Sequence, residues 1–198
     1  MGLALQRLAS EVGVHERTLR RAASSGLIHA RRPDSRRLLL SDREELWVRS
    51  HWALVGKLLT ALRTEPNLKL GVLFGSVARG EEVTGASDID LLVELRQPTP
   101  GALEGLRLRL QERLPAQVQL TPLHAAQRNP ELLLEILRDG RPLVDRAHLW
   151  MALKAQAGQA QSQADQARSE LQGEAQAALR YFQELANARG RLPLAIRG

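Results

Sequence analysis

The chain has 198 residues, of which 43% are hydrophobic and 25% are charged, and its formal net charge is +6. This is the composition of an ordinary globular protein, and the length suffices for one medium domain or two small ones. No apolar run approaches the roughly 18 residues that span a bilayer, and Arg7 interrupts the N-terminal apolar stretch, so we expect neither a membrane segment nor a secretory signal. The absence of cysteine excludes disulfides and thiolate metal sites. We therefore expect a cytoplasmic protein without a membrane partner.

Residues 3–26 show the pattern of two short helices around a tight turn at Gly13. The second helix places Leu19 inward and stops at Gly26. Residues 27–40 then offer two short β-prone pieces on either side of a Pro-Asp-Ser turn signal. This order predicts a helix-turn-helix followed by a small wing.

A longer helix is expected over residues 42–63. Ser41 and Glu44 stand at capping-box spacing, in which the serine hydroxyl accepts from a backbone N–H three residues on and the glutamate reaches back. A broad apolar face follows. This helix is expected to connect the N-terminal segment to a second domain.

Residues 68–146 alternate strand and helix signals, which predicts an α/β (α+β) unit around a mixed sheet. The expected domains are 1–49 for the winged helix-turn-helix, 50–67 for the linking helix, 68–146 for the α/β unit and 147–198 for a C-terminal helix and tail. Strands are expected at 69–74, 88–95, 116–121 and 142–145, and helices at 76–82, 102–113 and 130–138.

The C-terminal segment 147–189 is rich in alanine and glutamine and carries apolar residues at alternating steps of three and four. That periodicity predicts a long helix with coiled-coil character. The pattern leaves open whether the helix forms a homodimer or packs back on its own chain. The seam comprises Trp150, Leu153, Ala157, Ala160, Ala164, Ala167, Leu171, Glu174, Ala178, Tyr181 and Leu185.

One short stretch carries a chemical motif. A Gly75-Ser76 turn follows an apolar run, and eleven residues later Asp88 and Asp90 stand two apart on another apolar run. A glycine after a strand lets the backbone approach a phosphate, and the serine adds a hydroxyl donor. Two aspartates at i and i+2 on a strand point to the same face, where they can share magnesium ions.

These residues resemble the DNA-polymerase-β-like nucleotidyltransferase superfamily, and within it the minimal nucleotidyltransferases of prokaryotes, in which "GSxARG" precedes "SDIDLLV". The resemblance covers about residues 68–146. It implies that Asp88 and Asp90 are catalytic and bind magnesium, and that Gly75, Ser76 and Arg79 bind a nucleoside triphosphate, ATP above all. The alternative for Arg79 is an ordinary surface arginine.

The sequence departs from this pattern at Gln119. Active members of the superfamily usually carry a third carboxylate on a later strand, where it holds one metal and activates the attacking hydroxyl. The matching string here is "AQVQLTP", with Gln119 at that position. A neutral amide ligates magnesium weakly and cannot act as a base, so we expect nucleotide and magnesium binding to survive better than transfer.

Between residues 17 and 37 the chain has a strong excess of arginine over acid. Such a patch is typical of phosphate neutralisation. The string "ERTLRRAASSGLI" also resembles the helix-turn-helix of MerR-like winged regulators, which implies contact with double-stranded DNA. The alternative is a helical interaction module with an arginine-rich face. The DNA-binding residues implied are Arg17, Thr18, Arg20, Arg21, Arg36 and Arg37.

Three functions follow as hypotheses. The first is a DNA-binding regulator or antitoxin whose transferase domain binds nucleotide or a protein partner such as a toxin. The second is an active enzyme that moves a nucleoside monophosphate onto a protein, an RNA or a small-molecule hydroxyl. The third is a non-catalytic scaffold that oligomerises through its C-terminal helix.

Overall fold

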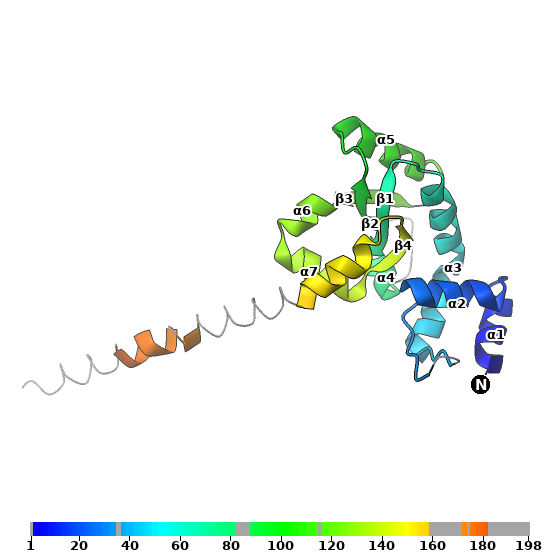
Figure 1. The fold of residues 1–198 in the computed structure, drawn as a ribbon, viewed down its shortest axis with the longest axis horizontal. Coiled ribbons are helices and arrows are strands. Elements are labelled where there is room, and N and C mark those ends of the chain that lie inside the picture. Colours follow the sequence, from blue (N-terminus) through cyan, green and yellow to red (C-terminus); the bar gives the residue numbers. More distant parts are fainter. Residues whose placement is uncertain are drawn as a thin grey trace, which may run out of the picture. The chain divides into compact units, whose positions relative to one another are not determined.

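The computed structural model describes residues 2–34, 37–81, 88–114, 116–158, 172–173 and 175–181. Its contacts divide the chain into two compact units, Met1–Lys154 and Ala155–Gly198. The first unit holds every predicted site residue. Figure 1 shows its helices and strands in chain order.

The two expected N-terminal helices form, as α1 (Gly2–Glu11) and α2 (Glu16–Ser25). Gly13 makes the turn between them at a φ of +70°, and Gly26 ends α2 in the left-handed region. The predicted wing forms no pair of strands in the described residues. Its two pieces meet in one isolated bridge between Arg31 and Leu39, because the short polar segment buries too little surface to extend the ladder.

Helix α3 (Asp42–Arg63) has the predicted length, and the hydroxyl of Ser41 accepts from the Glu44 backbone N–H at 3.2 Å. The prediction that the Glu44 side chain reaches back to the helix N-terminus is wrong. Glu44 is buried, and its carboxylate pairs with Arg141 while also accepting from the His29 backbone N–H at 2.8 Å. A buried guanidinium is a stronger partner for a buried carboxylate than its own helix N-terminus.

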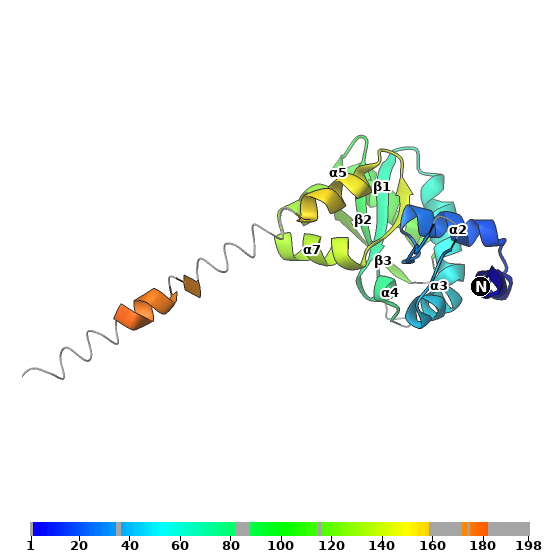
Figure 2. The same cartoon turned by 60° about the horizontal axis from the view of Figure 1, so that its bottom comes forward.

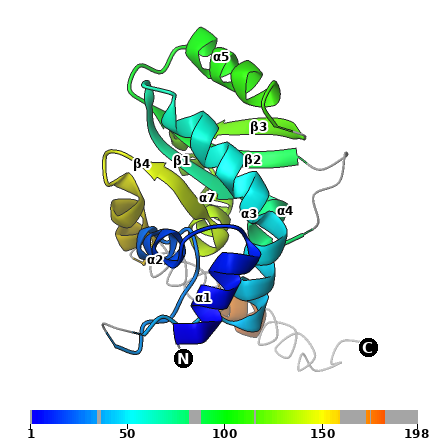
Figure 3. The same cartoon turned by 90° about the vertical axis from the view of Figure 1, so that its right-hand side faces the viewer.

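The expected mixed sheet is confirmed, with strand order β3-β2-β1-β4. Strand β1 is antiparallel to both neighbours, and β2 is parallel to β3. Helices lie on both faces of the sheet (Figures 2 and 3), so the α/β (α+β) fold class predicted from the sequence is confirmed. The strands are β1 (Leu68–Phe74), β2 (Asp88–Leu95), β3 (Gln117–Pro122) and β4 (Arg141–Asp145).

Helices α3 and α7 lie on opposite faces of this sheet, as Figures 2 and 3 show from two sides. Helix α4 ends earlier than predicted because Gly80 caps it in the left-handed region. Helix α6 was not predicted, since its five residues are too few to show helical periodicity. The remaining helices are α4 (Gly75–Arg79), α5 (Pro100–Gln111), α6 (Leu123–Gln127) and α7 (Pro130–Asp139).

Alternation along β2 decides where its aspartates point. Ile89, Leu91 and Val93 join the same buried cluster as the apolar residues of α3. Side chains of a strand alternate between faces, so Asp88 and Asp90 point to the opposite face, which is the α7 side. The site residues therefore lie away from the α3 core.

A further helix begins at residue 149 and is described up to residue 158. Trp150 and Leu153, the first two residues of the predicted seam, are buried within the first compact unit. At these two positions the seam packs on its own chain. Much of the remaining seam lies outside the described residues, including Ala160, Ala164, Ala167, Leu171, Glu174 and Leu185. Across the described ranges, no helix combines the length and apolar character that a bilayer crossing needs.

Candidate nucleotide and metal site

The site begins at Gly75, the residue that joins β1 to α4. Its φ is +73°, and a Cβ built there would lie 3.1 Å from the Cγ of Asp90 and 3.3 Å from the Cβ of Asp90. The missing side chain lets the Asp90 carboxylate lie directly against the Gly75 backbone. Ser76 follows, partly exposed, as the second residue of α4.

The two predicted catalytic aspartates lie together on one face of β2. Asp88 is exposed and Asp90 is half-buried. Among the described residues, none donates a hydrogen bond to either carboxylate or pairs with it as an ion. Burial raises the pKa of Asp90, and the neighbouring Asp88 charge raises this pKa further, while Arg79 lowers it and Glu135 raises it. Two uncompensated carboxylates at such a position are typical of a cation site.

Gln119 lies on β3, beside the strand that carries the two aspartates. In the parallel pairing of β2 with β3, Asp90 lies opposite Gln119 and Asp88 lies opposite Gln117. Paired residues share a face, so both exposed glutamines flank the aspartates. A neutral amide thus lies opposite Asp90 in this pairing.

The donor set fits magnesium in part. Within the described ranges, no cluster of three or more His, Cys, Asp or Glu side chains is arranged to hold a metal ion. Magnesium in nucleotide sites commonly uses one or two carboxylates and takes its remaining ligands from phosphates and water. Asp88 and Asp90 match that requirement for a metal that arrives with a triphosphate.

Arg79 is engaged in ion pairs. Its Nη1 donates to Oε1 of Glu135 on α7 at 2.7 Å, and its Nη2 donates to Oε1 of Glu81 at 3.1 Å. Neither acid was singled out from the sequence. Glu135 lies 56 positions from Arg79 along the chain, so only the folded arrangement of α4 and α7 brings the two together.

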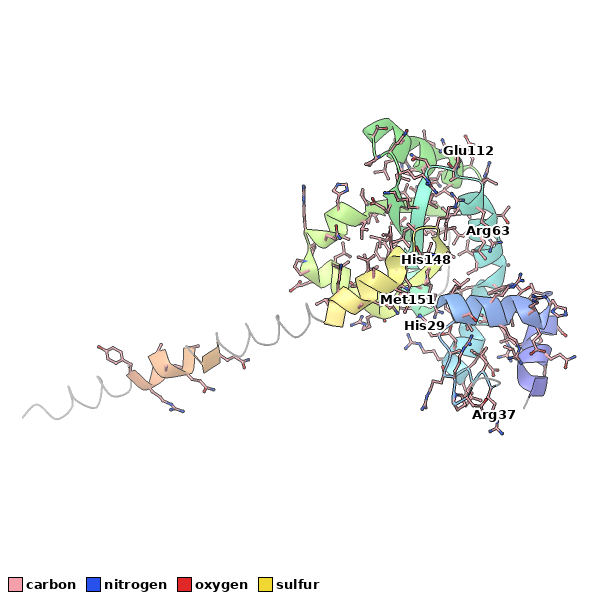
Figure 4. All side chains as sticks on the ribbon, in the orientation of Figure 1. His29, Arg37, Arg63, Glu112, His148 and Met151 are labelled. Carbon is pink, nitrogen blue, oxygen red and sulfur yellow. The ribbon has the colours of Figure 1, made fainter. Side chains whose placement is uncertain are left out.

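Most of the predicted DNA-binding residues are exposed in the N-terminal segment. Arg17, Thr18 and Arg21 are exposed on α2. Arg20 is half-buried and donates through Nε to Glu16 at 2.7 Å. Arg37 is exposed at the outer end of the N-terminal segment, away from the sheet (Figure 4). Arg36 lies outside the described residues.

A buried arginine that the sequence did not reveal joins the N-terminal segment to the sheet. Arg141 on β4 donates through Nη2 to Glu44 at 3.0 Å and through Nη1 to the Leu27 carbonyl at 3.0 Å. Its Nε donates to the Ala78 carbonyl at 2.8 Å, and its guanidinium lies 3.5 Å from the ring centroid of Trp47. This one side chain connects α3, α4, β4 and the segment after α2.

Residues 56–149 match the family model described as polymerase beta, nucleotidyltransferase. This segment is therefore similar to nucleotidyltransferase domains of the polymerase beta type. The match includes Gly75, Ser76, Asp88, Asp90 and Gln119. The N-terminal helices lie outside it.

Several solved structures are similar to the chain. One is a toxin–antitoxin complex with AMP-PNP, at 22% identity and a TM-score of 0.48, covering 62% of this chain and 98% of that chain. Another is a mutant of the MntA–HpeT toxin–antitoxin, at 21% identity and a TM-score of 0.49, covering 62% and 98%. A third is the MNT antitoxin complex with the tri-AMPylated HEPN toxin of Shewanella oneidensis, at 20% identity and a TM-score of 0.46, covering 64% and 98%. No curated protein matches the sequence.

Replacing Gly75 by alanine should damage the nucleotidyltransferase domain more than the same change at Gly13. Both glycines have left-handed backbone angles, +73° and +70°, so each substitution carries a backbone cost of about 1–2 kcal/mol. The new methyl group at Gly75 would also collide with the Asp90 side chain, whereas nothing lies within 4 Å of a Cβ at Gly13. Urea unfolding should show a larger loss of stability for G75A than for G13A. Equal losses would contradict the packing of Asp90 on Gly75.

The titration of Asp90 gives a pH prediction. Because its pKa is raised in the folded chain, the folded state holds this proton more tightly than the unfolded state. Proton binding by Asp90 therefore stabilises the folded chain at low pH. This stabilisation is lost as pH rises from the ordinary aspartate pKa through the raised pKa of the folded chain. Carbon-detected NMR of the Asp90 carboxyl should show a midpoint above the usual aspartate range, and Asp88→Asn should lower that midpoint by removing a like charge. A midpoint in the usual range for the wild-type chain would contradict this account.

Proposed function

We propose that this chain binds a nucleoside triphosphate together with magnesium at Asp88 and Asp90, and that its nucleotidyl transfer is weak. The observation that carries the proposal is the pair of unpartnered carboxylates on β2, of which Asp90 lies against the left-handed Gly75, within a segment that matches a nucleotidyltransferase family. In this proposal, Asp88 and Asp90 are the protein ligands of the metal. Gly75 and Ser76 offer backbone and hydroxyl donors to the phosphates.

When bound, magnesium would stabilise charge on the triphosphate and its leaving group. Gln119 limits the transfer step, because its amide cannot accept the proton of an attacking hydroxyl. It also brings no negative charge to the metal beside Asp90. The result is a site better suited to holding a nucleotide than to transferring it.

Calorimetric titration with magnesium and a non-hydrolysable ATP analogue tests the proposal. Asp90→Asn should weaken binding by about tenfold or more, the equivalent of about 1.4 kcal/mol. The matched control is Glu94→Gln, which removes a negative charge from the same face of β2. Glu94 pairs there with Lys69, with 3.7 Å between Oε1 and Nζ. Equal affinity for the wild type and D90N would refute the assignment of this site.

A second candidate function is binding of double-stranded DNA through the N-terminal helices. Arg17, Arg21 and Arg31 are exposed, and among the described residues no acid pairs with any of them. Three free guanidinium groups on one short segment fit a row of phosphates. We propose that α2 and the segment after it form this interface.

Replacing Arg17 and Arg21 together by alanine tests the DNA interface. The double variant should bind duplex DNA more weakly, and the slope of log affinity against log salt should fall by roughly 1 for each arginine removed. The control removes the same charge from Arg96 and Arg128, which are exposed outside the N-terminal helices. If both double variants lose the same affinity, α2 is not the interface.

For the protein partner, the proposal follows the sequence resemblance, which implies an antitoxin that acts on or binds a toxin. The product of a neighbouring gene is the partner to test. Incubated with this chain, magnesium and ATP labelled at the α-phosphate, such a partner should acquire label or bind in a stable complex. A neighbour that does neither would leave the chain without an antitoxin role toward that protein.

A further inference from the structure

Arg79, the arginine predicted to bind phosphate, already has two acidic partners. Arg79 Nη1 donates to Glu135 at 2.7 Å, and both Nε and Nη2 donate to a single oxygen of Glu81, at 3.3 Å and 3.1 Å. Three of the five N–H donors of the guanidinium are occupied. One positive charge thus faces two negative charges.

The place of Glu135 in the fold makes this pairing relevant to the nucleotide site. Helix α7 covers the sheet face toward which Asp88 and Asp90 point, and Glu135 lies midway along that helix. Arg79 is the last residue of helix α4, whose first residue, Gly75, lies against Asp90, and α4 contacts both β2 and α7. The Arg79–Glu135 ion pair therefore lies on the same side of the sheet as the carboxylates that would receive the metal.

The carboxylates around the site repel an anionic triphosphate. Asp88, Asp90, Glu81 and Glu135 carry four negative charges, against which Arg79 supplies one positive charge and Arg43, whose Nη2 donates to the Arg79 carbonyl at 3.0 Å, a second. The side chains of Arg79 and Glu135 are 32% and 43% exposed, so their pairing is weak enough to exchange with another anion. A polyphosphate would compete with Glu135 for the same guanidinium.

We propose that Glu135 withholds Arg79 from the nucleotide and that triphosphate binding requires Arg79 to exchange Glu135 for phosphate oxygens. This inference rests on the proposed nucleotide site and adds its regulation. Glu135 is a positioning residue here, because it acts through Arg79. Any interaction that draws Glu135 away would raise nucleotide affinity.

The test is titration of magnesium with a non-hydrolysable ATP analogue into the full chain and its Glu135→Gln variant. E135Q should bind the analogue about two- to fivefold more tightly, the range for release of a partly exposed ion pair. The matched control is Glu131→Gln, which removes the same charge one turn earlier on α7, where Glu131 is exposed and has no ion partner among the described residues. E131Q should bind like the wild type.

A double-mutant comparison shows whether the effect passes through Arg79. In an Arg79→Ala background, adding E135Q should change affinity little, because the guanidinium for which Glu135 competes is gone. The same gain in that background, or no gain in the single variant, would overturn the inference while leaving the nucleotide site intact. Absence of binding by both the wild type and E135Q would overturn the nucleotide site as well.

Discussion

Replacing Arg141 by leucine is expected to lower the free energy of unfolding by about 3–5 kcal/mol, the cost of breaking a buried ion pair from one side. Arg141 and Glu44 are 4% and 5% exposed. Without the guanidinium, the Glu44 carboxylate stays buried beside the His29 N–H alone, and the carbonyls of Leu27 and Ala78 lose a donor. Denaturation by urea, followed by circular dichroism, measures the change.

Two comparisons make the Arg141 result specific. Arg138→Leu removes a neighbouring arginine whose side chain is 70% exposed, and it should cost less than about 1 kcal/mol. The double variant Glu44→Met with Arg141→Met should be more stable than R141L, because no unpaired charge remains buried. If R141L unfolds at the same urea concentration as R138L, the buried network does not hold the N-terminal segment on the sheet.

Replacing Gln119 by aspartate is expected to raise nucleotidyl transfer by about tenfold or more, where each factor of ten corresponds to about 1.4 kcal/mol of transition-state stabilisation. The new carboxylate would stand opposite Asp90 in the β2–β3 pairing and complete a set of three acids. It would supply a base for the attacking hydroxyl and a charged ligand for the metal. ATP labelled at the α-phosphate, with host lysate as acceptor, reports the transfer.

The control for Gln119 is its neighbour on the same strand and face. Gln117→Asp adds the same charge but places it opposite Asp88, two residues from the position of the missing ligand. Q117D should transfer no faster than the wild type. A gain in Q117D equal to that in Q119D would mean that added negative charge, rather than the position beside Asp90, limits the reaction.

Local patterns along the chain predicted most of the fold. Helix α3 begins after Ser41 and ends at Arg63, as its cap and apolar face indicated. Strand β2 covers the predicted residues 88–95. Its bounds could be predicted because the apolar alternation and the flanking turn residues all lie within or beside this one element. The sequence placed Gln119 on a later strand but gave no register, and the pairing of Gln119 with Asp90 comes from the structure.

Two ion pairs that the sequence did not reveal, Arg141–Glu44 and Arg79–Glu135, join residues distant along the chain. Glu44 has the spacing of a capping box, yet it pairs with an arginine 97 positions away. Arg79 was predicted as a phosphate ligand, and its contact with Glu135 depends on how α7 returns to the sheet. Periodicity and motif spacing report on one element at a time, so partners brought together by topology leave no local signal.

Paramagnetic NMR shows whether a divalent cation and a nucleotide meet at Asp88 and Asp90. Manganese added at substoichiometric amounts with an ATP analogue should broaden the amide signals of Gly75, Ser76, Asp88 and Asp90 and spare those of α2. Asp88→Asn with Asp90→Asn should abolish that selective broadening. Broadening that is absent at these four residues, or that persists unchanged in the double variant, would contradict the account.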